Sequence, residues 1–210
     1  MAINATNSGT VRELIPAGNY LARCYQMIQI GTVAEIVMGK SSTLHKVRIG
    51  WELPEELRVF DEKKGEQPLV ISKEYTLSMN EKANLRKDLQ SWRGKGFTED
   101  EAKCFDITKL LGVPCMINII HKSGVSDPSK KYEQISGITP IPKTLKAPPA
   151  INKIFCLSYD NFDFGLFESL PDFIKTKMRG SIEFAALSQP KSGAHVDASE
   201  ITEPVDDLPF

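Results

Sequence analysis

The sequence predicts a mainly β protein with helical insertions, in which a five-stranded Greek-key barrel is followed by a short helical appendage and a disordered acidic tail. Three observations favour this fold class. Five runs of the chain are rich in β-branched and aromatic residues, a helical segment separates the third run from the fourth, and the stretch from Gln189 onward has few apolar side chains. We expect the barrel at residues 1–142, the appendage at 143–187 and the tail at 188–210.

The first three strands are predicted from composition and alternation. Residues 19–37 are too rich in β-forming side chains and too irregular in period for a helix, so we expect one long strand bent at Gly31. Residues 44–53 alternate between an apolar face and a basic face. After a charged connector at residues 54–68, a third strand is expected at residues 69–79.

A helical segment follows the third strand. Asn80 can cap a helix over residues 81–92, which Gly94 ends. Thr98 to Glu101 has the spacing of a capping box and opens a second, shorter helix. Residues 107–111 form one more turn.

Two further strands, at residues 113–121 and 132–138, complete the predicted barrel. Three strands, a helical segment and two strands are the order of an OB-fold, a small Greek-key barrel that binds oligonucleotides on the face of its second and third strands. The alternative is an unrelated small β-barrel or sandwich with the same strand count.

Binding of single-stranded nucleic acid requires positive charge for the phosphates and aromatic rings on which bases stack. Trp51 shares its face with Val47 and Ile49, so we expect it in the core, whereas Tyr75 and Tyr132 either stack on bases or pack in the barrel. The candidate DNA-binding residues belong to the second and third strands and to the loop between the fourth and fifth: Lys40, Lys46, Arg48, Lys73, Tyr75, Lys122, Lys130, Lys131 and Tyr132.

The printed chain finishes with an acidic and hydrophobic peptide made of Asp206, Asp207, Leu208, Pro209 and Phe210. A receptor pocket can bury the Phe210 ring while basic side chains pair with the terminal carboxylate and the aspartates. This peptide resembles the C-terminal tip of the bacterial single-stranded DNA-binding proteins. The resemblance implies a tip that recruits replication or repair proteins, and the alternative is a disordered end with an accidental phenylalanine.

Charge is distributed unevenly along the chain. The net charge is −1 for the whole sequence, but residues 189–210 carry five acids against one lysine, a net of −4, which leaves +3 for residues 1–188. A basic body with an acidic tail is typical of proteins that bind nucleic acid.

A second resemblance covers more of the chain. Residues 71–94, with the Pro16-Ala17-Gly18 entry and the C-terminal tip, resemble a group of phage-encoded single-stranded DNA-binding proteins. The resemblance implies an OB-fold accessory of replication, recombination or repair in the host cytoplasm. It carries over no catalytic residue.

The appendage is expected to form two short amphipathic helices broken near Pro171. Residues 160–175 include Phe162, Phe164, Phe167 and Phe173, which are too apolar to remain in water. They pack either on the barrel of the same chain or on a second subunit, as the contact of a homodimer.

Other classes of function find little support in the sequence. The common hydrolase, NTPase and deaminase motifs are absent, and four scattered cysteines with three histidines give no zinc pattern, so we expect no enzyme, no cofactor and no metal. No apolar run approaches the roughly 20 residues of a membrane span, so we expect a soluble cytoplasmic protein without membrane association.

Three hypotheses remain: a single-stranded DNA-binding protein, a protein-interaction module that acts as a decoy through the tip, and an unrecognised DNA-processing enzyme.

Overall fold

The computed structural model describes residues 13–37, 39–124 and 127–188. The tail and the tip, expected from sequence at residues 188–210, lie outside these ranges except for Ser188, which ends the last helix. The strands are β1 (Gly18–Val37), β2 (Lys40–Asp61), β3 (Gly65–Thr76), β4 (Pro114–Ser123), β5 (Lys131–Thr139) and β6 (Phe155–Leu157). The helices are α1 (Asn84–Arg93), α2 (Glu99–Cys104), the 3-10 turn η1 (Ile107–Leu110), α3 (Phe164–Glu168), α4 (Asp172–Arg179) and α5 (Ile182–Ser188).

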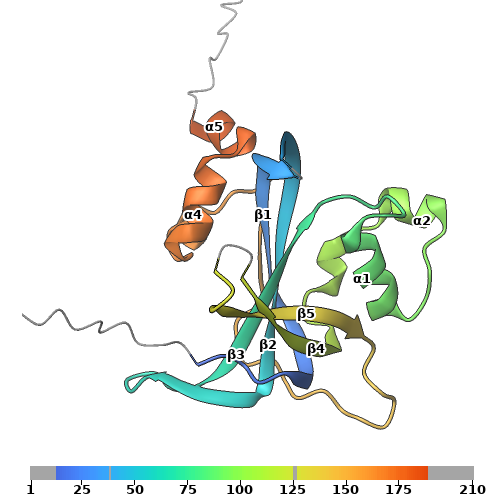
Figure 1. The fold of residues 1–210 in the computed structure, drawn as a ribbon, viewed down its shortest axis with the longest axis vertical. Helices are drawn as coiled ribbons and strands as arrows, with labels where there is room; N and C mark the ends of the chain where they lie inside the picture. Colours follow the sequence, from blue (N-terminus) through green and yellow to red (C-terminus); the bar gives the residue numbers. More distant parts are fainter. Residues whose placement is uncertain (1–12, 38, 125–126, 189–210) are drawn as a thin grey trace, which may run out of the picture.

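Five antiparallel strands form one sheet in the order β3-β2-β1-β4-β5, and this sheet curls into a half-barrel. The short strand β6 runs parallel to β1 and pairs with it over Gln26 to Ile28. The first helices, α1 and α2, lie on one side of the long strands, and α4 and α5 lie on the other (Figure 1). The mainly β fold class is confirmed, and the strand order is compatible with an OB-like fold.

The predicted bend at Gly31 is present as a bulge in β1. Gly31 has a φ of 95°, and the pairing of β1 with β2 shifts register between Gln29 and Gly31. A Cβ atom at this position would lie 2.7 Å from side-chain atoms of Ser181 and Glu183. Glycine is therefore required both by the left-handed backbone and by the close approach of the segment that leads into α5.

The prediction of a charged connector at residues 54–68 is wrong, because most of these residues belong to strands β2 and β3. β2 and β3 continue to the turn between Asp61 and Gly65 and form a long hairpin. Pro54 suggested a break, but it lies inside a register shift between Leu53 and Leu57, where the ladder does not need its missing N–H.

The helical segment begins three residues later than expected. α1 starts at Asn84 with Ala83 as its N-cap, while the Asn80 side chain accepts a hydrogen bond from the Lys82 N–H in the preceding turn. The capping box from Thr98 to Glu101 is present at the start of α2. Asparagine is suited to both positions, so the sequence alone does not separate a cap from such a turn.

Two hydrophobic cores occupy the two faces of the sheet. The larger core fills the inner face beneath α1 and contains Trp51 and Trp92, whose ring centroids are 5.8 Å apart, so the core position expected for Trp51 is confirmed. The smaller core lies between the outer face of β1 and the appendage; its buried members are Ile28, Ile30, Val33, Leu157, Phe167, Leu170, Ile174 and Met178. The buried apolar residues of the appendage therefore pack on the half-barrel of the same chain, whereas Phe164 and Phe173 are 59% and 62% exposed, so a contact of this segment with a second subunit stays a prediction.

Residues 148–152, which precede β6, form a strap over the outer face of the sheet. Arg23 of β1 and Glu52 of β2, which are neighbours across the two strands, hold this strap in place. Glu52 is fully buried and accepts hydrogen bonds from the backbone N–H groups of Ile151 and Asn152 at 3.0 and 2.7 Å. Arg23, which faces Glu52 in the β1–β2 pairing, donates to the Pro148 carbonyl at 2.5 Å. The strap and the appendage together build a wall beside the outer face of β1 and β2.

Candidate nucleic-acid interface

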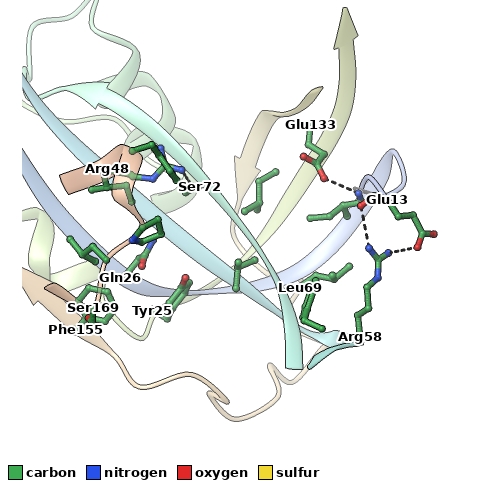
Figure 2. A pocket seen from close by; sticks show the side chains of 18 residues that line it. Glu13, Tyr25, Gln26, Arg48, Arg58, Leu69, Ser72, Glu133, Phe155 and Ser169 are labelled. Carbon is green, nitrogen blue, oxygen red and sulfur yellow. Dashed lines mark hydrogen bonds and ion pairs between the residues drawn. The ribbon is translucent and has the colours of Figure 1, made fainter. Parts of the chain in front are cut away.

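A groove of about 700 Å³ runs along the outer face of β1, β2 and β3. One wall is formed by β6 and by the start of α4, and the far end reaches the N-terminal segment and β5. In Figure 2, Tyr25, Gln26 and Arg48 lie at one end, and Arg58 and Glu13 lie at the other.

Arg48 is the charged centre of the first end. Its Nη2 donates to Ser72 Oγ at 2.5 Å, and its Cζ lies 5.2 Å from the centroid of the Phe173 ring on α4. Burial lowers the pKa of Arg48 from its ordinary value, an effect opposed by the nearby Glu74 and Tyr25. A guanidinium remains protonated in proteins, so this end of the groove holds a half-buried positive charge beside an aromatic ring.

Tyr25 forms the wall next to Arg48. Its ring meets the Phe155 ring of β6 edge-on, with centroids 6.3 Å apart. Burial, with a smaller effect from the charge of Glu52, raises the pKa of Tyr25 to about 12. The phenol therefore remains neutral at physiological pH and is able to donate a hydrogen bond.

The floor of this end is shaped by Gly50, which pairs with Gln26 across β1 and β2. A Cβ atom at Gly50 would lie 2.5 Å from side-chain atoms of Gln26. The Gln26 side chain therefore lies over Gly50. It has room there because glycine carries no side chain.

The other end of the groove is formed by the outer part of the β2–β3 hairpin. Arg58 donates to the Glu13 carbonyl at 3.1 Å and pairs with the Glu13 carboxylate at 3.3 Å. Beside it, Phe60 is 62% exposed and Val70 is also exposed. This end thus combines a guanidinium with an aromatic ring that is open to solvent.

Of the candidate residues on the second and third strands, the structure places Arg48 in the groove. Lys46 lies on the same face, but it belongs to a network of two lysines and two glutamates that ties β1, β2 and β3 to α4. Lys46 Nζ is 2.7 Å from Glu35 and 3.7 Å from Glu74, and Lys177 Nζ is 2.6 Å from each of the same carboxylates. The charge of Lys46 is therefore already balanced within the protein.

Lys73 and Tyr75 lie on the opposite, inner face of β3. Lys73 Nζ is 2.6 Å from the Asp88 carboxylate of α1, and the Tyr75 hydroxyl donates to the same carboxylate at 2.8 Å. Tyr75 is 3% exposed and belongs to the larger core. Of the two roles left open for Tyr75, the structure gives it packing in the barrel.

The remaining candidates of the body lie on exposed loops and strand ends. Tyr132 is 53% exposed on β5 and faces Lys122 across the β4–β5 pairing, next to the groove residue Glu133. Lys40, Lys122, Lys130 and Lys131 are exposed, and Lys130 Nζ is 3.6 Å from the Asp127 carboxylate. The tip residues Asp206, Asp207, Leu208, Pro209 and Phe210 lie outside the described residues.

Sequence reasoning missed several residues that line the groove. Arg58 and Phe60 fell within the assumed connector, although Leu57, Arg58 and Val59 alternate apolar and charged side chains as a strand does. Tyr25, Phe155 and Phe173 come from three separate segments, and only the folded chain brings them together. This short alternation could have identified Arg58 as a strand residue, but it ends before Phe60.

Comparisons with known proteins identify no relative. No protein-family model matches the chain, and neither the curated proteins nor the solved structures include a match. Within the ranges that the structure describes, no helix is long and apolar enough to cross a membrane. In those same ranges, no three side chains of His, Cys, Asp or Glu gather in a way that could hold a metal ion.

Proposed function

We propose that this protein binds single-stranded DNA along the outer-face groove of the half-barrel, without requiring a particular sequence, in replication, recombination or repair. The observation that carries the proposal is the groove itself: guanidinium groups and accessible aromatic rings lie together on the outer face of the first three strands. In OB-folds the face of strands 2 and 3 is the one that binds oligonucleotides. The proposal assigns the tip, Asp206 to Phe210, to the recruitment of partner proteins.

In this proposal, aromatic rings stack on the bases and basic side chains attract the phosphates. Phe60 and Phe173 are both 62% exposed, so each offers a ring on which a base can stack. Arg48 and the exposed lysines of the β4–β5 hairpin attract the phosphates, and Arg58 can do so by exchanging its ion pair with the exposed Glu13 for a phosphate. Because Lys46 and Lys73 are paired with carboxylates, we expect few phosphate contacts and a moderate dependence of affinity on salt.

The test is a salt titration with the full chain. Fluorescence anisotropy of labelled oligo-dT should show binding at low salt, and the logarithm of the binding constant should fall linearly with the logarithm of salt concentration. A duplex of the same length is the control and should bind more weakly, because its bases are not free to stack. Absence of oligo-dT binding at low salt would reject the proposal and favour a protein-interaction module, and metal-dependent cleavage of the oligonucleotide would favour an enzyme.

The role of the tip requires a separate experiment. Deleting Asp206 to Phe210 should leave the affinity for oligo-dT unchanged or slightly higher, because the two aspartate charges are removed and the terminal carboxylate moves to Val205. The matched variant Phe210→Ala keeps the aspartates and should affect only the capture of replication or repair proteins. A large loss of DNA affinity in either variant would contradict this division of roles.

A further inference from the structure

The Arg48 end of the groove contains three side chains with polar groups that make no hydrogen bond to the described part of the chain. Arg48 Nε is buried and has no partner among the described residues, although Nη2 of the same guanidinium donates to Ser72 Oγ. Neither the Gln26 carboxamide nor the Tyr25 hydroxyl makes a hydrogen bond with another residue in the ranges 13–37, 39–124 and 127–188. Unpaired polar groups that converge in a groove are costly unless a ligand or water satisfies them. Figure 2 shows all three at the same end of the groove.

We infer that this end is a compartment that reads the edge of one nucleobase in the bound strand and prefers guanine. The inference rests on the proposed function and adds a preference at one position of a strand that is otherwise held through stacking and phosphates. The compartment is defined by Tyr25, Gln26, Arg48, Ser72 and Phe173.

The compartment favours guanine because its charged side chain, Arg48, can donate hydrogen bonds but cannot accept them. A guanidinium has five N–H donors and no acceptor, and Arg48 uses one of them on Ser72. The N7 and O6 atoms of guanine are two adjacent acceptors, and arginine on this pair is the commonest specific contact with a major-groove base edge. At the corresponding edge adenine and cytosine each present an amino donor, which would face a guanidinium donor.

The surroundings of Arg48 fit a planar ligand. The Phe173 ring lies over the guanidinium and is 62% exposed, so it can also cover a base whose edge meets Arg48. Gln26 offers both a donor and an acceptor, and the neutral Tyr25 hydroxyl offers a donor or an acceptor to the remaining atoms of that edge. Glu52 does not compete for the base, because both of its oxygens accept backbone N–H groups of the strap.

The experiment compares oligo-dT strands that carry a single central dG, dA, dC or 7-deaza-dG with uniform oligo-dT, again by anisotropy with the full chain. We expect the dG strand to bind about fivefold tighter or more than uniform oligo-dT, the lower limit for a bidentate base contact. The 7-deaza-dG strand should lose most of this gain, because it lacks the N7 acceptor. These measurements use the unaltered protein and do not depend on the folding of a variant.

Variants then test the named side chains through the ratio of dG to dT affinity. Arg48→Lys keeps the positive charge but loses the planar fork, and Gln26→Ala removes the amide; both should lower the ratio toward one. Phe164→Ala, which removes an exposed ring of α3 outside the groove, should keep the ratio. Melting temperatures identify any variant whose fold is altered.

Three results would overturn the inference, with different consequences for the proposed function. Equal affinity for all four strands, with oligo-dT still bound, would overturn the base-reading compartment and leave the proposed function in place. No binding of any strand at low salt would overturn both. A preference for dA or dC over dG would also overturn the assignment, since it would show that Arg48 does not direct the choice of base.

Discussion

Phe173 provides the most direct test of the groove. It lies on α4 with its ring over Arg48 and is 62% exposed, and it belongs to the lining of the groove. Phe164, on α3, is similarly exposed at 59% but does not line the groove. The variants Phe173→Ala and Phe164→Ala therefore remove the same side chain at equal exposure, inside and outside the candidate site.

The expected loss of stability is similar in the two variants. Roughly two-fifths of a ring of about 200 Å² is buried in each case, so about 80 Å² of apolar contact is lost, worth about 2 kcal/mol as an upper limit. The expected loss of DNA affinity differs between them. Removing a ring on which one base stacks costs about 1–3 kcal/mol of binding, or about fivefold to more than a hundredfold.

The assay is anisotropy with oligo-dT at low salt, combined with thermal melting of each variant. Phe173→Ala should bind at least fivefold more weakly than the unaltered protein, and Phe164→Ala should bind as the unaltered protein does. Full affinity in Phe173→Ala would refute the groove as the DNA-binding surface. An equal loss in both variants would point to a general effect of the appendage on folding.

Three further predictions concern the framework around the groove. Gly31→Ala should lower the melting temperature by several degrees, because the added Cβ meets Ser181 at 2.7 Å on a left-handed backbone; an unchanged melting curve would contradict the close approach. Hydrogen bonds from Lys177 and Lys46 lower the pKa of Glu35, so the stability it provides is present above its unfolded-state pKa and is lost as the pH falls through the lower folded-state value. Glu35→Gln should flatten that part of the acid melting profile, and an unaltered profile would exclude this contribution. Tyr75→Phe should reduce stability by about 1 kcal/mol through the lost hydrogen bond and leave DNA affinity unchanged, whereas a clear loss of affinity would return Tyr75 to the binding surface.

Local patterns in the sequence determined the strands, the inner core and the bend at Gly31. Alternation separates Val47, Ile49 and Trp51 from Lys46 and Arg48, and this separation holds because successive side chains of a strand point to opposite faces. Residues 57–60 also belong to strand β2, but Pro54 and the charged side chains that follow it suggested a connector instead. These features depend on neighbours in the chain, so a single sequence reveals them.

Pairing between distant segments was decided only by the tertiary structure. Lys46, Arg48 and Lys73 look alike in sequence, yet Lys46 meets Glu35 and Glu74, Lys73 meets Asp88, and Arg48 lies in the groove beside Phe173. Whether a basic side chain is available to a ligand depends on which acid the fold brings within a few ångströms, and that acid can come from any part of the chain. The sequence by itself therefore determined the mainly β fold and the two faces of its strands, while the folded chain decided which charges and rings remain open on the outer face.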